Sequence, residues 1–480
     1  MTRCLRAPVC SAILILALLL CPRPLHARRL SLSDAIRMAM KRNPELALEE
    51  AKVEEAEATR KSTRGLYGPR LMMEGNLLVW DSPLAFELNL PDASQTDLNA
   101  ALGQLNLTPQ ETGTLMKYSD LLGLFPKLMP LFFDFDLGNI RDQVTAQLSF
   151  TLAQPLTPLL QIHNGYRATS NVVQAVRLEH KGKAQEVAHK VSKTYFQLMQ
   201  ARQLAEVAQT GVDQVEAHLK QARHFYVAGL IGKQEVLKAQ LELARAKERV
   251  IKARTGVSLA SSALALLLGL DLDQEFTLTE QVVDPPKSFP RRLRQCLEQA
   301  LRQRTEIKAM QRRQQAAEHG RKSAMWDMLP QISAVATYQH TQGQGTFSPE
   351  NSFFAGGVLK WDLWDWGNKY YAARAALHRR RQAELGQRLL REGVQLQTKQ
   401  AFLELRQSEE ALTVGRVAIT EAEENFRIEK RRFEANANTS TDVLDAQLAL
   451  TRAKLSYTTA LYGYYIARAS LLHAMGQIEI

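Results

Sequence analysis

Hydrophobic and polar positions change their period along the chain. From Leu32 onward apolar residues recur at helical spacing, which predicts a first helix at 31–66. Between Val144 and Leu152 apolar and polar residues alternate strictly, as in a strand with one apolar face. Helical spacing then returns. The chain is therefore predicted to run from helix to strand and back to helix.

Two spans without proline favour very long helices. All 17 prolines lie outside residues 159–284 and 350–480, and a proline inside a helix costs about 3 kcal/mol. Charged residues continue along both spans, so one face of each helix is expected to stay in water. The helices predicted in these spans are 166–228, 233–268, 368–434 and 440–475.

The sequence is a tandem duplication. Leu32 matches Leu293, and the same offset of 261 carries Pro69 to Pro330. In the later halves the offset is 207, as between Tyr226 and Phe433, so the first copy holds 54 extra residues. The predicted repeats are 28–284 and 285–480. The first repeat contains an insertion at 81–142, and the second begins with a helix at 291–328.

Each repeat is also predicted to contain two strands, 70–80 and 143–155 in the first and 331–340 and 353–363 in the second. Strands of about 9–11 residues suit a membrane crossing. No segment after the N-terminal region approaches 18 uninterrupted apolar residues, so any crossing is expected through strands. Single-chain barrels need at least about eight strands. Other copies of the chain are therefore expected to complete the sheet.

The N-terminal segment 1–27 is predicted to be a signal peptide. Arg3 and Arg6 precede a short apolar stretch, and Ala27 is a small residue suited to cleavage. Lipidation of Cys21 is the competing interpretation, although Leu20 before it is not small. Cys296 is the only cysteine after this segment, so no intrachain disulfide is expected.

Charge and chemistry exclude other classes. The net charge is +11, but the basic residues are scattered along helical patterns without a basic-aromatic module, so no nucleic acid partner is expected. The ten histidines form no HxxxH or HExxH pair, and no P-loop or G-x-S-x-G motif occurs. Met325 and Met328 are interpreted as helix packing rather than a soft-metal site. No enzyme activity, cofactor or metal is predicted.

Several segments, in the same order in both repeats, resemble the TolC-like outer-membrane factors over nearly the whole mature chain. They are residues 32–71 with the Pro69/Pro330 boundary, the 363–367 turn Leu-Trp-Asp-Trp-Gly, and the tip at 227–231. The resemblance implies a mainly α fold with a membrane β-barrel part. Long-helix hairpins would form a trimeric α-helical tunnel, and four strands per subunit would complete a 12-stranded barrel in the homotrimer. Trp361, Trp364 and Trp366 cluster where the last predicted strand meets the long helix, and aromatic residues there suit the membrane interface; the alternative is a buried cluster at the helix junction.

This resemblance implies a function in the cell outer membrane with a long periplasmic extension. The chain would be the passive exit duct for drugs or toxic small molecules. Its partners would be a periplasmic adaptor, an inner-membrane pump of the RND, ABC or MFS type, and outer-membrane lipid. Two alternatives stay open: the duct of a type I protein-secretion system, and a non-channel envelope scaffold. The alternating strands argue against the scaffold.

The resemblance also indicates where the function resides. Two hairpin tips are expected to contact the adaptor, unless they are only turns, in which Gly229 or Asn436 supplies the residue with positive φ. Asp442 and Asp445, three residues apart, are expected to line the periplasmic entrance, with Glu235 at the position matching Asp442. The plainer interpretation of Asp442 is a carboxylate at a helix N-terminus. The expected tip residues are Gly229, Leu230, Ile231, Gly232, Asn436, Ala437, Thr439 and Ser440.

Two features depart from the family pattern. Gate latches of the family often use a Tyr and an Arg near the second tip, and here these positions hold Phe433 and Asn438. The sequence therefore does not predict which residues hold the entrance closed. The insertion 81–142 would be extracellular, and its apolar piece at 121–135 either covers the pore mouth as a lid or packs against the barrel rim.

Overall fold

The computed structural model describes residues 28–85, 139–274, 276–280, 289, 292–345 and 348–478. The predicted signal peptide with Cys21, and residues 86–138 of the insertion with its apolar piece at 121–135, lie outside the described residues. The chain divides into two compact units. The helical unit comprises Met1–Lys61, Gly165–Arg321 and Ala373–Ile480, and the strand unit comprises Ser62–Asn164 and Lys322–Ala372. Each sequence repeat contributes to both units.

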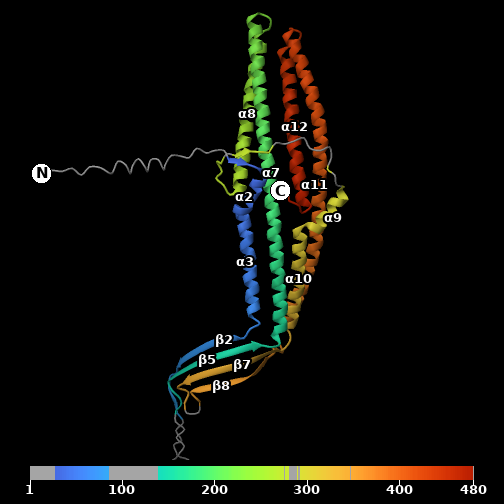
Figure 1. The fold of residues 1–480 in the computed structure, drawn as a ribbon. Helices are drawn as coiled ribbons and strands as arrows, with labels where there is room; N and C mark the ends of the chain where they lie inside the picture. Colours follow the sequence, from blue (N-terminus) through green and yellow to red (C-terminus); the bar gives the residue numbers. More distant parts are fainter. Residues whose placement is uncertain are drawn as a thin grey trace, which may run out of the picture. The chain divides into compact units, whose positions relative to one another are not determined.

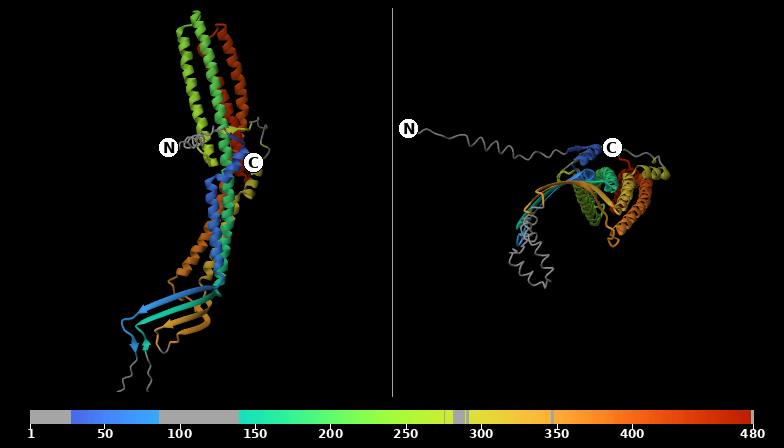
Figure 2. Two further views of the ribbon diagram at one scale, coloured as in Figure 1. Left: turned by 60° about the vertical axis from the view of Figure 1, so that its left-hand side comes forward. Right: turned by 90° about the horizontal axis from the view of Figure 1, so that it is seen from below.

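In each repeat a long helix lies beside shorter helices that follow one another end to end (Figures 1 and 2). The long helix α7 begins at Pro158, earlier than the predicted residue 166, because proline is well tolerated in the first turn of a helix. In the first repeat the helices are α2 (Leu32–Arg42), α3 (Pro44–Gly65), α7 (Pro158–Val227) and α8 (Lys233–Leu268). In the second they are α9 (Leu293–Gln303), α10 (Thr305–Trp326), α11 (Asn368–Glu434) and α12 (Ser440–Ala474).

The single helix predicted at 31–66 is wrong, because the chain breaks at Asn43 between α2 and α3. Pro44 disfavours helical geometry in the residue before it, and Asn43 is extended with φ −68° and ψ 124°. The Asn43 side chain accepts a hydrogen bond from the backbone N–H of Glu45 at 2.8 Å and so caps α3. One residue therefore ends one helix and begins the next.

The helix predicted at 291–328 is also interrupted, at Arg304 (φ −59°, ψ 128°), although no proline follows. Gly476, with φ 77°, packs against this break: a Cβ on Gly476 would lie 3.1 Å from the Arg304 backbone nitrogen. Gly269, with φ 64°, packs in the same way on the first break, since a Cβ added there would lie 3.0 Å from the Arg42 carbonyl oxygen. In both repeats the break thus leaves room for a glycine that follows the last helix.

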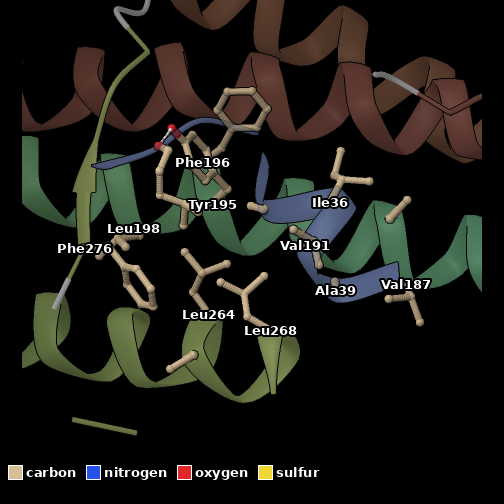
Figure 3. Packing of buried hydrophobic residues seen from close by; sticks show 14 of the residues in the cluster. Ile36, Ala39, Val187, Val191, Tyr195, Phe196, Leu198, Leu264, Leu268 and Phe276 are labelled. Atoms are coloured by element: carbon tan, nitrogen blue, oxygen red, sulfur yellow. Dashed lines mark hydrogen bonds between the residues drawn. The ribbon is translucent and has the colours of Figure 1, made fainter. Parts of the chain in front are cut away.

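The largest hydrophobic core of the helical unit lies where α2, α7 and α8 meet a small parallel ladder (Figure 3). In this ladder β1 (Arg28–Leu30) pairs with β6 (Phe276–Leu278). Tyr195 of α7 is fully buried, donates its hydroxyl to the Leu30 carbonyl at 3.0 Å and also contacts the Glu280 carboxylate. The core therefore ties both strands to the long helix. Its other large members include Ile36, Val187, Val191, Leu198, Leu264 and Leu268.

The strand unit is built on one antiparallel sheet in the order β2-β5-β7-β8 (Figure 2). Its central strands β5 and β7 come from different repeats, so the sheet joins the two repeats of the chain. The last strand begins and ends earlier than the predicted 353–363. A further two-stranded ladder, β3 (Leu84–Ala85) with β4 (Asn139–Arg141), forms the base of the insertion. The four strands are β2 (Arg70–Val79), β5 (Val144–Pro155), β7 (Gln331–Gln342) and β8 (Asn351–Lys360).

Candidate functional site

The sheet has two chemically different faces. Its register pairs Leu71 with Leu152, Leu152 with Ala336, and Ala336 with Ala355. Paired residues share a face, and neighbours along a strand alternate between faces. The face that carries these pairs is apolar over the middle of all four strands, and the polar residues Gln154, His340, Gln342 and Asn351 lie on it only near the strand ends. Its apolar members include Leu71, Met73, Leu77, Val79, Leu148, Phe150, Leu152, Ala334, Ala336, Tyr338, Phe353, Ala355 and Leu359. The opposite face carries most of the polar side chains, including Arg70, Glu74, Asn76, Gln147, Ser149, Thr151, Ser333, Thr337, Gln339, Ser352 and Lys360.

The apolar face is not covered by the described chain. Leu71 and Phe353 are each 72% exposed. Burying such side chains would stabilise the protein by about 25 cal/mol for each Å² of apolar surface removed from water. A contiguous apolar sheet face next to a polar one is the arrangement of a membrane strand, with lipid on one side and an aqueous lumen on the other.

The three tryptophans that follow β8 are exposed. Trp361 directly follows the last residue of β8 and is 52% exposed. Trp364 and Trp366 meet edge to face at 5.6 Å and are 76% and 87% exposed. The alternative prediction of a buried cluster is therefore wrong for the described chain.

The first tip joins α7 to α8 through a left-handed turn at Gly229, with φ 71°. The backbone N–H of Leu230 closes this turn on the Phe225 carbonyl at 2.9 Å, and the Leu230 side chain is 53% exposed. Ile231 instead packs inward on the small core near the tips. Gly232 is the N-cap of α8 without a side chain to cap it. Of this predicted set, Leu230 is the large side chain that reaches solvent.

The second tip turns at Asn436, whose φ of 59° confirms the prediction of a residue with positive φ there. Asn438 donates its side-chain amide to the Glu429 carbonyl at 2.9 Å and to the Glu429 carboxylate at 2.6 Å. Thr439 caps α12, and Ala437 is exposed. Asn438 thus fastens the turn to the helix before it.

The two hairpins are joined just behind their tips. His218 of α7 shares a hydrogen bond of 2.6 Å with the hydroxyl of Ser440, and both side chains are buried. Lys238 of α8 donates to the Thr441 hydroxyl at 3.0 Å. Leu444 of α12 packs into the apolar cluster of α7 and α8, which comprises Val215, Leu219, Ala222, Val236 and Ala239. These contacts were not predicted, because no local sequence pattern reveals which faces of two hairpins meet.

Phe433, at a predicted gate position, is only 2% exposed and packs against His218 and Phe225, with ring centroids 4.9 and 5.4 Å away. Burial lowers the pKa of His218 to about 4, and the nearby Glu235 carboxylate opposes this shift in part. His218 is therefore neutral at pH 7. Phe433 has an internal packing role in the described chain.

The three predicted entrance carboxylates differ in their surroundings. Asp442 accepts hydrogen bonds from the backbone N–H and the hydroxyl of Thr439, at 2.9 and 2.7 Å, and these bonds lower its pKa. The plainer interpretation of Asp442 as a helix N-terminal carboxylate is thus met in the described chain. Asp445 is exposed on the same side of α12. The Glu235 side chain is only 12% exposed and pairs with Lys238 at 3.1 Å.

Two further properties bear on the class of protein. Among the described helices, α8 is long and apolar enough to cross a membrane by length and composition alone, and 17% of the relevant window is buried. Within the described residues, no group of three or more His, Cys, Asp or Glu side chains is arranged to hold a metal ion.

The fold is that of outer-membrane channels. The chain is similar to the outer-membrane channel OprN, with 16% identity, a TM-score of 0.72, and coverage of 93% of this chain and 89% of that one. It is also similar to the CmeC outer membrane channel of Campylobacter jejuni, with 14% identity, a TM-score of 0.71, and coverage of 93% and 85%. A third similar structure is the open state of the MtrE outer membrane channel of Neisseria gonorrhoeae, with 14% identity, a TM-score of 0.66, and coverage of 95% of this chain and 93% of that one.

The sequence itself matches the family model for outer membrane efflux proteins at residues 136–270 and 296–477. The chain belongs to the outer membrane efflux protein family, whose members are channels. No curated protein matches the chain. The two matched segments fall one in each of the predicted repeats, consistent with the tandem duplication.

Proposed function

We propose that three copies of this chain form a channel that crosses the outer membrane through a 12-stranded barrel and continues into the periplasm as a helical tunnel. The channel is the passive exit duct of a tripartite efflux system. A periplasmic adaptor and an inner-membrane pump deliver the substrate and supply the energy. The observation that carries the proposal is the apolar face that runs across all four strands of the sheet. A pore-free envelope scaffold would not need such a face.

The edges of the sheet support assembly with other copies. Within the described residues, β2 and β8 each pair on one side only, and nearly all of their residues are exposed. An open edge in lipid leaves unpaired backbone groups, each costing several kcal/mol. A barrel needs at least about eight strands, so two copies reach only the minimum and three give twelve.

A stripe on α11 also supports a partner copy. Leu389, Leu396 and Leu403 follow one another at intervals of seven residues and are 68%, 68% and 54% exposed. Leucines at this spacing form the seam of a coiled coil. A helix of the neighbouring copy would bury them in the tunnel wall.

The tips are proposed to contact the adaptor. The exposed part of the predicted set is smaller than the whole, because Ile231 and Ser440 face inward and Thr439 is engaged in capping. Leu230 and Ala437 are the side chains best placed for an outside partner.

Asp442 and Asp445 are proposed to line the periplasmic entrance. Threefold symmetry would bring six exposed carboxylates together there, and such a ring attracts cations in a wet channel. Glu235 is proposed to lie behind this ring rather than in it, because its side chain is mostly buried and pairs with Lys238. The exposed Trp361, Trp364 and Trp366 are proposed to lie at the membrane interface, where amphipathic rings are favoured.

Alternating cysteine labelling tests the barrel. Leu148→Cys lies on the apolar face and Ser149→Cys on the opposite one, while Cys296 is buried in the helical unit. In membranes, a polar maleimide should label Ser149→Cys through the lumen and leave Leu148→Cys unlabelled. Equal labelling of the two positions would contradict the barrel.

An export assay with a co-expressed adaptor and pump tests the tips. Leu230→Arg together with Ala437→Arg should abolish both adaptor cross-linking and export, while the trimer still forms. Leu237→Arg is the matched control, because Leu237 is also 53% exposed but lies further along α8. Unchanged export in the double variant, or the same loss in the control, would contradict contact at the tips.

A further inference from the structure

A small apolar pocket opens at the end of the sheet nearest the helices, wholly within the strand unit. It encloses about 250 Å³. Its lining includes Pro158, Leu160, Trp326, Leu329, Pro330 and Ile332, and the last of these belongs to the apolar face of the sheet through its pairing with Leu359. The pocket is therefore continuous with the face that the proposed function places against lipid.

The polar groups around the pocket already have partners. The Thr157 hydroxyl donates to the Pro330 carbonyl at 2.9 Å and accepts from the Ile332 N–H at 2.7 Å. The Gln161 amide donates to Asp327 at 2.9 Å. A polar ligand would find few free donors or acceptors here, whereas an apolar ligand would displace water from an apolar lining.

The large side chains of the lining are held partly open to solvent. Leu160, Leu329 and Trp326 are 49%, 47% and 38% exposed. Trp326 is the last residue of α10, and backbone hydrogen bonds from Met328 to Met325 and from Leu329 to Trp326 hold the turn that follows. These backbone hydrogen bonds thus fix the positions of the lining residues Trp326 and Leu329.

A second copy of the chain would not fill this pocket by extending the sheet. The pocket lies where β5 ends and β7 begins, and these are the two central strands. New strands would add at the outer edges, along β2 and β8. Strand addition at these edges would therefore leave the pocket uncovered.

We infer that this pocket is a binding site for one acyl chain of a membrane lipid, taken from the leaflet on the periplasmic side. The inference rests on the proposed function, which orients the sheet with its helical end toward the periplasm. The bound chain would extend the apolar contact of the barrel past the ends of its strands and fix the depth of the channel in the membrane.

Quenching of Trp326 by lipids with brominated acyl chains tests the site. The chain has five tryptophans, so a variant that keeps only Trp326 carries Trp80→Phe, Trp361→Phe, Trp364→Phe and Trp366→Phe. A companion variant keeps only Trp361 and reports on the membrane face itself. Both are assembled as trimers in nanodiscs made with brominated or ordinary phosphatidylcholine. Trp326 should lose at least as much emission as Trp361 in the brominated lipid, and iodide in the water should quench Trp326 little.

Two matched substitutions then separate a site from general lipid contact. In the Trp326-only variant, Leu329→Asn should reduce the quenching and admit iodide, because it places a polar group in the lining. Leu363→Asn, at a 77% exposed leucine outside the lining, should leave both signals unchanged. Equal effects of the two substitutions would overturn the site.

The reference variant identifies which proposal fails. Quenched Trp361 beside unquenched Trp326 would mean a pocket filled with water, which overturns the inference and leaves the barrel intact. If neither tryptophan is quenched, the sheet is not in lipid, and the proposed function fails together with the inference.

Discussion

In the first repeat the break between α2 and α3 falls at Asn43, whereas in the second repeat the equivalent break falls at Arg304. Asn43 acts through its amide, which donates to the Leu267 carbonyl at 3.1 Å, and is followed by a proline. No proline follows Arg304. Its guanidinium instead forms a bidentate ion pair with the Glu306 carboxylate, with N–O distances of 2.9 and 3.2 Å. The same backbone geometry is thus stabilised by the Asn43 side-chain amide in the first repeat and by the Arg304–Glu306 ion pair in the second repeat.

The long helices differ in a related way at one pair of matched positions, where each binds the backbone of the stretch between α8 and α9. Arg202 of α7 donates to the Phe276 carbonyl, while Glu409, 207 residues later on α11, accepts a hydrogen bond from the Phe289 N–H at 2.6 Å. The charge is reversed because the backbone group to be satisfied is reversed. The matched positions Arg202 and Glu409 thus both bind a backbone group, with a side chain whose charge suits that group.

The glycines that pack on the two breaks should show the largest effect. Gly269→Val and Gly476→Val would force a branched residue into positive φ and place Cβ about 3 Å from backbone atoms of the break. Each should destabilise the helical unit by about 2–5 kcal/mol, from backbone strain and overpacking together. The thermal midpoint of the purified trimer measures this effect.

Gly463→Ala provides the control for both glycine variants. Gly463 lies inside α12, and a Cβ there meets nothing within 4 Å. Alanine should stabilise the helix by up to about 1 kcal/mol. If Gly476→Val behaved like Gly463→Ala while Gly269→Val did not, the two breaks would not be held in the same way.

The buried histidine behind the tips should give the next largest effect. His218 is buried, whereas the matching position of the second repeat, Asn425, is exposed. The unfolded chain protonates His218 near pH 6.5 and the folded chain only near pH 4, so stability is lost as the pH falls through this window. The loss amounts to up to about 3 kcal/mol.

Thermal midpoints between about pH 4 and 7 measure this loss. His218→Gln should flatten the pH dependence of the midpoint in part only, because burial also lowers the pKa values of His189 and His473. Asn425→Gln, on the exposed matching position, should leave the pH dependence unchanged. An unaltered slope in His218→Gln would contradict the buried neutral state of this side chain.

A smaller loss of stability should follow from replacing a residue of the first repeat with its counterpart in the second repeat. Tyr195 is matched in the second repeat by Phe402, which has no hydroxyl to donate. Tyr195→Phe leaves the Leu30 carbonyl without this donor and should cost about 1–2 kcal/mol. The loss is seen as a lowered thermal midpoint and faster exchange of the amide hydrogens in β1 and β6. Unchanged exchange there would show that the ladder does not depend on Tyr195.

The sequence predicts what depends on local period and composition. The four long helices, the four strands of the main sheet and the positive-φ residues at Gly229 and Asn436 follow from spacing, proline positions and turn chemistry, whereas the short strands β1, β3, β4 and β6 were not predicted. Pro44 lies inside the predicted helix 31–66 and could have revealed the first break. The break at Arg304 has no local signal, because the glycine packed on it lies near the end of the chain.

The candidate site was predictable only as far as its turns and carboxylates. Asp442 and Asp445 stand out because they lie three residues apart after a turn. The burial of Phe433 and the pair of His218 with Ser440 depend on how α7 and α12 pack, which the period of either helix alone does not specify.

Single-channel conductance in a planar bilayer tests the central claim most directly, with wild type beside the double variant Asp442→Asn/Asp445→Asn. We predict discrete conductance steps from both proteins, and a cation preference in wild type that falls in the variant because the six carboxylates are gone. An unchanged cation preference would contradict the acidic entrance. The absence of conductance from both proteins, when each has inserted as a trimer, would contradict the channel.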